Sequence, residues 1–406
     1  MNINLDEYNY NLPADRIAMF PADKRSNSKL LIYKENKIID EHFYDIGKYL
    51  PQNTLFLYNN TKVFHARLKF FRSTGAEIEV FCLEPVEPHD ISLSMSETKT
   101  STWKCLVGNS RKWKNKDEIL TLTKNINNKD CTLSVIRISN DQDSSIIKFS
   151  WNNDLSFAEI LEIFGEIPLP PYIHRNSIES DNDRYQTVFA KAEGSVAAPT
   201  AGLHFTDKLI ETLKNEGKEF LPLTLHVGAG TFKPVKTDDI KDHKMHSENI
   251  IFTRQFIEEI YKKIDFKFIV PVGTTSCRSL ESLYWIGVML GEKTMNFNDT
   301  EIITLPQWYP YQNNKDIPIK ESLKNILSYL DKTKQDHLEA FTELIIIPGY
   351  KMKLLDALVT NFHQPNSTLL LLIASILNDN WKIIYNHALN NNYRFLSYGD
   401  SCLFFK

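Results

Sequence analysis

Small residues followed by a histidine form the most unusual segment of this sequence, which runs GSVAAPTAGLHFT from Gly194 to Thr206. Small side chains let a backbone come close to a ligand and leave its N–H groups free to bind it. The segment leads into a helix that we expect to begin after Thr206, and the start of a helix favours an anion. We therefore expect a ligand-contacting loop around His204, with a tight turn and an ordinary threonine cap as the alternative.

Glycines follow a predicted strand in a second segment, TLHVGAGTFKPV, which contains His226, Gly228 and Gly230. No third glycine opens a helix and the GK[ST] ending is missing, so the segment is neither a dinucleotide fingerprint nor a P-loop. A glycine bulge in a strand is the alternative, although His226 and Lys233 are polar groups that a bulge does not need.

A strand-to-helix turn carries hydroxyl groups and an arginine in the third segment, PVGTTSCRSLES. Ligands collect at the carboxyl ends of strands in open α/β sheets, which favours Thr274 and Thr275 as ligand contacts. Arg278 lies in the first turn of the expected helix, where the helix dipole is already positive. A carboxylate or phosphate partner would explain an arginine there, and a plain surface arginine is the alternative.

A fourth segment, HKMHSE, offers His243, His246 and Glu248. Two histidines and a glutamate could bind a metal, but the spacing matches no known zinc signature and no fourth ligand is evident. Hydrogen-bonding or acid–base roles and ordinary, satisfied side chains are the other interpretations.

Two C-terminal segments add further polar groups. TNFHQPNSTLL places Asn361 and His363 on a loop, because Pro365 disfavours helix before a cap at Ser367 or Thr368. YRFLSYGDS, from 393 to 401, holds an arginine, a tyrosine and Asp400 beside the last strand. Six segments of this kind in otherwise apolar settings predict one enzyme pocket.

Caps and periodicity indicate the elements that must position these segments. The helix after Thr206 has apolar residues at Leu209, Ile210 and Leu213 and a stop at Gly217. A helix is expected to end near Pro51. Further helices are expected at 321–332, 367–377 and 381–391, and strands at 56–60, 220–230, 266–273, 343–349 and 401–405.

Residues 67–158 have a different texture. Short alternating runs rich in Val, Ile, Thr and aromatic residues are separated by Asn, Asp, Gly and Lys, which predicts a small antiparallel β-barrel domain. We expect this domain to be inserted into a discontinuous α/β (α+β) catalytic body formed by 1–66 and 159–406. The polar stretch 286–342 is expected to be an insertion in that body.

Composition excludes several classes of protein. The 406 residues are 42% hydrophobic and 24% charged with a net charge of -4, which excludes a low-complexity chain and a globally basic nucleic-acid coat. The longest apolar run, LLLLIASIL, is too short to cross a bilayer, and the N-terminus lacks the pattern of a signal peptide. Five scattered cysteines without CxxC spacing indicate reduced, buried thiols in a cytoplasmic protein.

Nine strings, in order along the chain, resemble the S-adenosylmethionine:tRNA ribosyltransferase-isomerase family of the queuosine pathway. They are YNLPADRIAMFPADKRSNSKLLIY, NNTKVFHARL, GEIPLPPYIHR, DRYQTVFAKAEGSVAAPTAGLHFT, TLHVGAGTFKPV, HKMHSE, VGTTSCRSLES, LVTNFHQPNSTLLLL and YRFLSYGD. The resemblance implies an α/β body with an inserted β-barrel. It also implies transfer and isomerisation of the ribosyl group of S-adenosylmethionine onto 7-aminomethyl-7-deazaguanine at the wobble position of a tRNA. Epoxyqueuosine-tRNA, adenine and methionine would be the products, with no metal; we expect a monomer, with an oligomer left open.

The resemblance also suggests roles for individual residues. The reaction moves protons, for which histidine is suited. The expected catalytic residues are His204, His226, His246, Glu248, His363 and Asp400. The expected S-adenosylmethionine contacts are Ala198, Pro199, Thr200, Gly202, Gly228, Gly230, Thr274, Thr275, Arg278 and Asn361. Candidate tRNA contacts are Arg67, Lys69, Arg111, Lys112 and Arg175, with solvated charges as the alternative.

Some positions depart from the family's pattern. The usual asparagine–aspartate–threonine–arginine string is NNTK in this chain, with Asn60 and Lys62, and the usual serine–arginine pair is Ser28–Lys29. Lysine does not reproduce a bidentate arginine contact. Three other interpretations therefore stay open: a diverged S-adenosylmethionine-dependent transferase with another acceptor, a non-catalytic RNA-binding protein, and a metal-dependent hydrolase.

Overall fold

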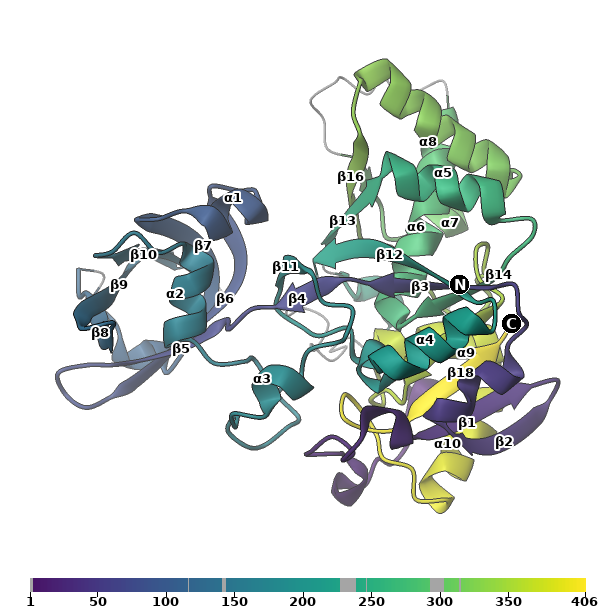
Figure 1. Ribbon diagram of the computed structural model, residues 1–406, viewed down its shortest axis with the longest axis horizontal. Helices are drawn as coiled ribbons and strands as arrows, with labels where there is room; N and C mark the ends of the chain where they lie inside the picture. The colour runs from purple at the N-terminus through teal and green to yellow at the C-terminus, as the bar shows by residue number, and fades with distance from the viewer. Residues whose placement is uncertain are drawn as a thin grey trace.

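The computed structural model describes residues 3–115, 117–140, 144–226, 239–245, 247–292, 303–313 and 315–406, except for the side chain of Glu193. A curled sheet on the left of Figure 1 stands apart from a larger α/β body on the right. The mixed α/β architecture with an antiparallel barrel-like sheet confirms the predicted fold class.

A ten-stranded mixed sheet forms the centre of the body. Its order is β15-β16-β13-β12-β3-β14-β17-β18-β1-β2, and β12, β3, β14 and β17 run parallel to their neighbours within that group. The strands are β1 Lys29–Lys34, β2 Lys37–His42, β3 Thr54–Asn59, β12 Glu219–His226, β13 Glu248–Thr253, β14 Phe268–Val272, β15 Ile303–Leu305, β16 His337–Thr342, β17 Ala357–Asn361 and β18 Ser401–Phe405.

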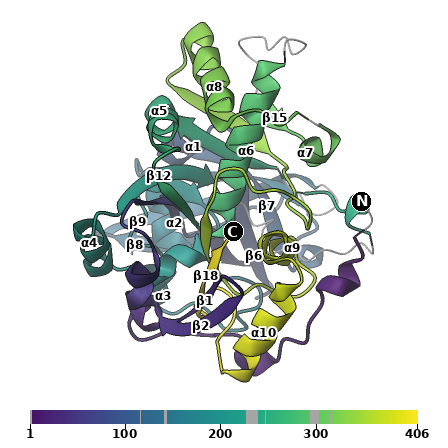
Figure 2. The ribbon, with the colours of Figure 1, turned by 90° about the vertical axis from the view of Figure 1, so that its right-hand side faces the viewer.

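Both faces of this sheet are buried, because successive side chains of its central strands enter different cores. Leu55 and Leu57 of β3 join the larger core, whereas Phe56 between them joins the core on the opposite face. The body helices are α4 Asp207–Asn215, α5 Arg254–Lys263, α6 Thr274–Gly291, α7 Tyr309–Gln312, α8 Ile319–Thr333, α9 Thr368–Leu377 and α10 Asn380–Asn390. Both views place α5 beside α8, away from α9 and α10 (Figures 1 and 2).

The smaller sheet has the order β5-β6-β7-β10-β9-β8 and is antiparallel throughout. Its edge strands β5 and β8 approach each other, which nearly closes the sheet around a core that includes Trp103 and Phe149. The strands are β5 Arg67–Phe71, β6 Glu77–Glu87, β7 Thr100–Gly108, β8 Leu120–Ile126, β9 Lys129–Asn140 and β10 Ser145–Trp151, and the helices beside them are α1 Ile91–Ser96 and α2 Phe157–Phe164.

Two segments that lead to and from this sheet lie side by side. The parallel strands β4 Thr61–Val63 and β11 Ala192–Ser195 pair with each other between the sheet and the body (Figure 1). Nearer the sheet, the N–H groups of Arg67 and Glu166 each donate to the other residue's carbonyl oxygen, at 3.3 and 2.8 Å. The short helix α3 Asp181–Arg184 belongs to the returning connection, the segment that leads from α2 beside the smaller sheet back to β11.

Several sequence predictions are confirmed at the level of single elements. Thr206 caps α4 by accepting a hydrogen bond from the N–H of Leu209 at 3.2 Å, and Gly217 follows the helix with a φ of 89°. The apolar run 367–377 is a buried helix, α9, and all five cysteines are free and buried. Among the described helices, none has both the length and the apolar character that a membrane span requires.

Two predicted elements are wrong. The segment before Pro51 is a 3₁₀ helix, Phe43–Tyr49, rather than an α-helix. Residues 343–349 form no strand; the strand there is β16, which ends at Thr342. The apolar residues that follow are buried, and isolated hydrogen bonds such as that from the N–H of Ile345 to the carbonyl oxygen of Gln307 hold them.

The domain boundaries stay a prediction. In the stretch 286–342, α6 continues to Gly291, α8 packs on α6, and β15 and β16 extend the ten-stranded sheet. This stretch is therefore part of the body's sheet and core in its described portion.

Candidate functional site

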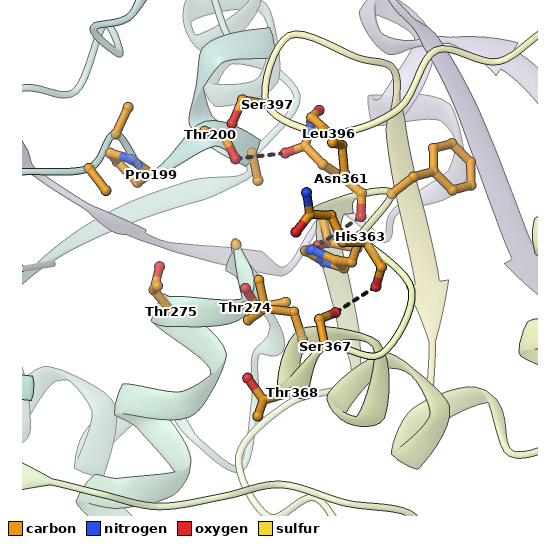
Figure 3. A pocket seen from close by; sticks show the side chains of 18 of the residues that line it. Pro199, Thr200, Thr274, Thr275, Asn361, His363, Ser367, Thr368, Leu396 and Ser397 are labelled. Carbon is orange, nitrogen blue, oxygen red and sulfur yellow. Dashed lines mark hydrogen bonds between the residues drawn. The ribbon is translucent and has the colours of Figure 1, made fainter. Parts of the chain in front are cut away.

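The main cavity lies at the carboxyl ends of β14 and β17 (Figure 3). Its open space amounts to about 830 Å³, a volume that includes the part open to solvent. Four segments and Tyr172 wall it; the segments are the small-residue loop 197–201, the start of α6, the end of β17 with the loop that leads to α9, and residues 396–397. Four of the predicted segments therefore meet at one place.

Two helix N-termini face this cavity. Gly273, at the turn from β14 into α6, has a φ of 94°, which strongly favours glycine over other residues. Thr274 and Thr275 in the first turn of α6 line the cavity, as do Ser367 and Thr368 at the start of α9. Because the N-terminal ends of both helices carry partial positive charge, the cavity is suited to an anionic group.

A chain of hydrogen bonds leads from the cavity wall into the interior. The Thr200 hydroxyl donates to Asn361 Oδ1 at 3.2 Å, and Asn361 Nδ2 donates to His204 Nε2 at 3.0 Å. His204 Nδ1 lies 2.8 Å from the hydroxyl of Ser28. With Nε2 as an acceptor, the proton of His204 is assigned to Nδ1, so one neutral tautomer is favoured.

Burial, together with the nearby positive charges of Arg394 and Arg25, lowers the pKa of His204 to about 3. Burial also lowers the pKa of His363 to about 3. His363 lines the main cavity, and its Nε2 lies 2.9 Å from the Thr360 hydroxyl. Both imidazoles are therefore neutral at pH 7, and each can accept a hydrogen bond on its unprotonated nitrogen.

Acid should destabilise the fold through His204. The unfolded chain binds a proton on this histidine below about pH 6.5, whereas the folded chain does so only near pH 3. The stabilising contribution is therefore complete above pH 6.5 and is lost as the pH falls toward 3. We expect this site to cost on the order of 2 kcal/mol at pH 5, and a His204→Gln variant to lack that loss. Urea unfolding of both proteins at pH 7 and pH 5 measures it; equal losses would contradict the prediction.

Arg278 and Glu248 form a buried ion pair beside the main cavity. They line a neighbouring cavity that shares Thr274 and Thr275 with the main one. Burial lowers the pKa of Arg278 to about 10, so the guanidinium stays charged at pH 7. Because Glu248 already compensates that charge, Arg278 is less free to clamp a substrate carboxylate than the sequence suggested.

Other predicted site residues lie outside the main cavity. His226 lines a different cavity and its Nδ1 lies 3.1 Å from the carbonyl oxygen of Gly194. Gly202 is buried, with Thr187 3.0 Å from the position of an added Cβ. Asp400 is buried and accepts the N–H groups of Lys29 and Arg394 at 3.0 and 2.8 Å. His246, Gly228 and Gly230 lie outside the described residues.

Motif strings also contained lining residues that the sequence analysis did not name as ligand contacts. Tyr172, Thr360, Gln364, Ser367, Thr368 and Ser397 all line the main cavity. The Tyr172 hydroxyl is 2.5 Å from that of Ser397, which joins the returning connection to the C-terminal segment. Membership of the strings PPYIHR, TNFHQPNSTLL and YRFLSYGD was the only sequence signal for them.

The three positions that depart from the family's pattern do not line the main cavity. The Asn60 side chain accepts a hydrogen bond from the Thr224 hydroxyl at 3.0 Å. Lys62 pairs with Glu162 at 2.9 Å, and Lys29 donates to the carbonyl of Asn391 at 2.8 Å. Each departure therefore falls on a contact between segments of the protein.

The candidate tRNA contacts differ in how far their charge is compensated. Lys69 pairs with Glu166, Arg67 lies 3.6 Å from Glu79, and Arg175 forms a two-pronged pair with Asp181. Arg111 and Lys112 are exposed on the barrel.

In the ranges that the structure describes, no cluster of three or more His, Cys, Asp and Glu side chains could hold a metal ion; His246, which the hydrolase interpretation requires, lies outside them.

Sequence comparisons point to one family. The family described as "Queuosine biosynthesis protein" matches residues 5–404. The S-adenosylmethionine:tRNA ribosyltransferase-isomerase of Sulfurihydrogenibium sp. (strain YO3AOP1) is 36% identical over 406 residues, 99% of each chain. That of Clostridioides difficile (strain 630) is 35% identical over 98% of each chain. A solved structure of S-adenosylmethionine tRNA ribosyltransferase from Thermotoga maritima is 26% identical, covers 98% of this chain and 99% of that chain, and has a TM-score of 0.46.

Proposed function

The chain belongs to the queuosine biosynthesis protein family, and from this premise we propose that it is an S-adenosylmethionine:tRNA ribosyltransferase-isomerase. It transfers and isomerises the ribosyl moiety of S-adenosylmethionine onto 7-aminomethyl-7-deazaguanine at the wobble position of a tRNA. Epoxyqueuosine-tRNA is formed, and adenine and methionine are released. The observation that carries the proposal is identity of 32–36% to relatives of that name over essentially their whole length.

Three features of the main cavity support its assignment as the S-adenosylmethionine site. Small residues at Ala197, Ala198 and Ala201 leave room for the backbone to approach an adenosyl group. The methionine carboxylate would be stabilised by the N-terminus of α6 or α9, since both point their positive ends at the cavity. This assignment replaces Arg278 as the main carboxylate contact, because Arg278 is paired with Glu248.

His363 is the imidazole best placed for the proton transfers. The sulfonium acidifies the C5′ protons of the ribosyl group, so a neutral base nearby can remove one. A pKa of about 3 in the free protein makes His363 a weak base, so removal of the C5′ proton depends on strong acidification by the sulfonium. The imidazolium that forms readily passes its proton to the departing adenine. The aminomethyl group attacks in its neutral form. His204 and Asn361 would hold the cavity wall and its hydrogen-bond pattern.

The direct test is incubation with S-adenosylmethionine and tRNA that carries 7-aminomethyl-7-deazaguanine, followed by mass analysis of the nucleosides. We expect epoxyqueuosine, with adenine and methionine in equal amounts. Adenine and methionine released without modified tRNA would indicate a different acceptor, and tight tRNA binding without any affinity for S-adenosylmethionine would contradict the enzyme assignment. We propose no resident metal, so activity should persist after chelation, and a cytoplasmic location, in keeping with five free thiols.

The exposed pair Arg111 and Lys112 is a proposed contact for the tRNA backbone. Reversing both charges to glutamate should weaken tRNA binding and flatten its dependence on salt, by about 0.7–0.9 in the log–log slope for each phosphate that is no longer neutralised. The KM for S-adenosylmethionine should stay unchanged, because the barrel does not line the main cavity. Filter binding at several salt concentrations measures the slope; an unchanged slope would rule this patch out.

A further inference from the structure

A smaller cavity walled by three arginines adjoins the main one. Arg25, Arg184 and Arg394 line it together with His204 and Ser397. They come from three distant parts of the chain: the N-terminal segment, α3 and the segment before β18. We call this cavity the arginine pocket. Ser397 lines both cavities, so a ligand in one lies beside a ligand in the other.

Two of these arginines are held by neutral groups. Arg25 donates to the carbonyl oxygens of Leu203 and Asp183, at 3.3 and 2.6 Å. Arg184 donates to the carbonyl oxygens of Asp23, at 3.2 Å, and of Ala22. Within the described ranges neither guanidinium has a carboxylate oxygen at ion-pair distance, and the buried Nε of Arg184 has no hydrogen-bond partner. Carbonyl groups orient these side chains without cancelling their charge.

Two of the nearby carboxylates also bind other groups, whereas the Asp183 carboxylate acts on Arg25 from beyond ion-pair distance. Asp400 lies 3.5 Å from Arg394, but its oxygens also accept the backbone N–H groups of Lys29 and Arg394. Asp181 is bound by both terminal nitrogens of Arg175 and by the Tyr398 hydroxyl. The arginine pocket therefore keeps a surplus of positive charge. An oxyanion that can accept two parallel hydrogen bonds from one guanidinium group is the ligand that such arginines recognise best.

An exposed aromatic ring lies on the same N-terminal segment. Phe20 is 54% exposed, and the guanidinium of Arg175 lies 4.3 Å from the centre of its ring. Arg394 donates to the carbonyl oxygen of Phe20 at 3.3 Å, so this residue is next to the arginine pocket. An exposed ring beside a pocket lined by three arginines suits a nucleotide, whose base stacks while its phosphate is bound. A bare carboxylate would use the arginines and leave the ring unexplained.

We propose that the arginine pocket binds a phosphodiester group of the RNA strand next to the nucleotide that enters the main cavity. This inference rests on the proposed function, because it takes the acceptor to be a nucleotide within a tRNA. Binding of the phosphate would fix the strand while the modified base reaches past Ser397 into the main cavity. Arg25, Arg184 and Arg394 would then determine affinity for tRNA and not affinity for S-adenosylmethionine.

The test compares three anticodon stem-loop RNAs that carry 7-aminomethyl-7-deazaguanine. One has an unmodified backbone, and each of the other two has one of the two linkages that flank this nucleotide replaced by neutral methylphosphonate. For the wild-type protein, one replacement should raise Kd about tenfold, as expected when a hydrogen bond to a charged group is removed. In Arg25→Gln and Arg184→Gln variants, Kd for the normal RNA should rise by a similar factor, and the same methylphosphonate should then add little.

Arg254→Gln is the matched control, since it removes one positive charge from α5 and should leave both RNA affinities unchanged. Thermal unfolding and the KM for S-adenosylmethionine identify variants that lose structure, and Arg25→Lys keeps the charge if Arg25→Gln does not fold. Equal methylphosphonate effects in wild type and variants would overturn the proposal. So would an increased KM for S-adenosylmethionine at unchanged RNA affinity, which would assign the pocket to the methionine carboxylate. RNA binding is measured without turnover, so an inactive wild type that still shows the coupling would refute the proposed function alone.

Discussion

Replacing His363 by asparagine should lower kcat by about 10²–10⁴-fold, the range for loss of a general acid–base group. His363 is the imidazole that lines the main cavity in the described structure. The variant should keep its fold, because the main chain of this residue is held independently of the side chain. Its N–H donates to the Tyr385 hydroxyl at 3.2 Å, and its carbonyl oxygen accepts from the Tyr10 hydroxyl.

Single-turnover kinetics with saturating S-adenosylmethionine measure this loss without interference from product release. Calorimetric binding of S-adenosylmethionine should give a Kd within a few-fold of the wild type, since the N-termini of α6 and α9 are untouched. His42→Asn is the matched control, because His42 stacks on Tyr44, away from the cavity. A His363→Asn protein with wild-type kcat would remove this histidine from the proton-transfer scheme.

Truncation of Glu281 should produce the largest loss of stability. This carboxylate in α6 is fully buried and accepts the Tyr350 hydroxyl at 2.6 Å. It also accepts the backbone N–H groups of Lys353 and Leu354, at 2.9–3.0 Å and 2.9 Å. Glu281→Ala leaves these donors buried without an acceptor, and we expect it to lower the free energy of unfolding by about 3–5 kcal/mol.

Urea unfolding at pH 7 measures this change. Glu281→Gln should lie between the wild type and the alanine variant, because its amide keeps one acceptor oxygen but turns an N–H₂ group toward other donors. Glu258→Ala, on the partly exposed side of α5, should change stability by less than about 0.5 kcal/mol. If Glu281→Ala cost as little as Glu258→Ala, the Glu281 carboxylate would not be the acceptor that holds Tyr350 and the 353–354 backbone in place.

Local signals in the sequence predicted the elements well where a cap or a strict pattern was present. Thr206 and Gly217 marked α4, and alternation in 67–158 marked the barrel strands. The run at 343–349 misled because an apolar run reports burial and not strand pairing; Leu344 and Ile346 are buried without a strand partner. The 3₁₀ helix before Pro51 shows that spacing alone does not separate helix types. Phe43 and Ile46 are three residues apart, so they lie on one face in an α-helix and in a 3₁₀ helix alike.

Four of the six segments that the sequence analysis singled out line the main cavity, because its walls are short contiguous segments. Partners from distant elements were beyond such reasoning. Nothing in the local sequence tells that Glu248 of β13 faces Arg278 of α6, or that Arg25, Arg184 and Arg394 converge. His226 illustrates the reverse error: it belongs to a predicted segment, but its strand directs it into another cavity. The individual catalytic and binding roles stay predictions.

The paired strands β4 and β11 restrict how the barrel can move. A domain connected by one flexible segment could rotate freely. The barrel is connected by two segments, which hydrogen-bond to each other through β4 and β11 and, nearer the barrel, through the backbones of Arg67 and Glu166. Free swivelling would require those bonds to break, so the spacing between barrel and body is preset. An RNA that contacts both the barrel and the body would have to match that spacing in order to bind, so the linkage would select RNAs by their shape.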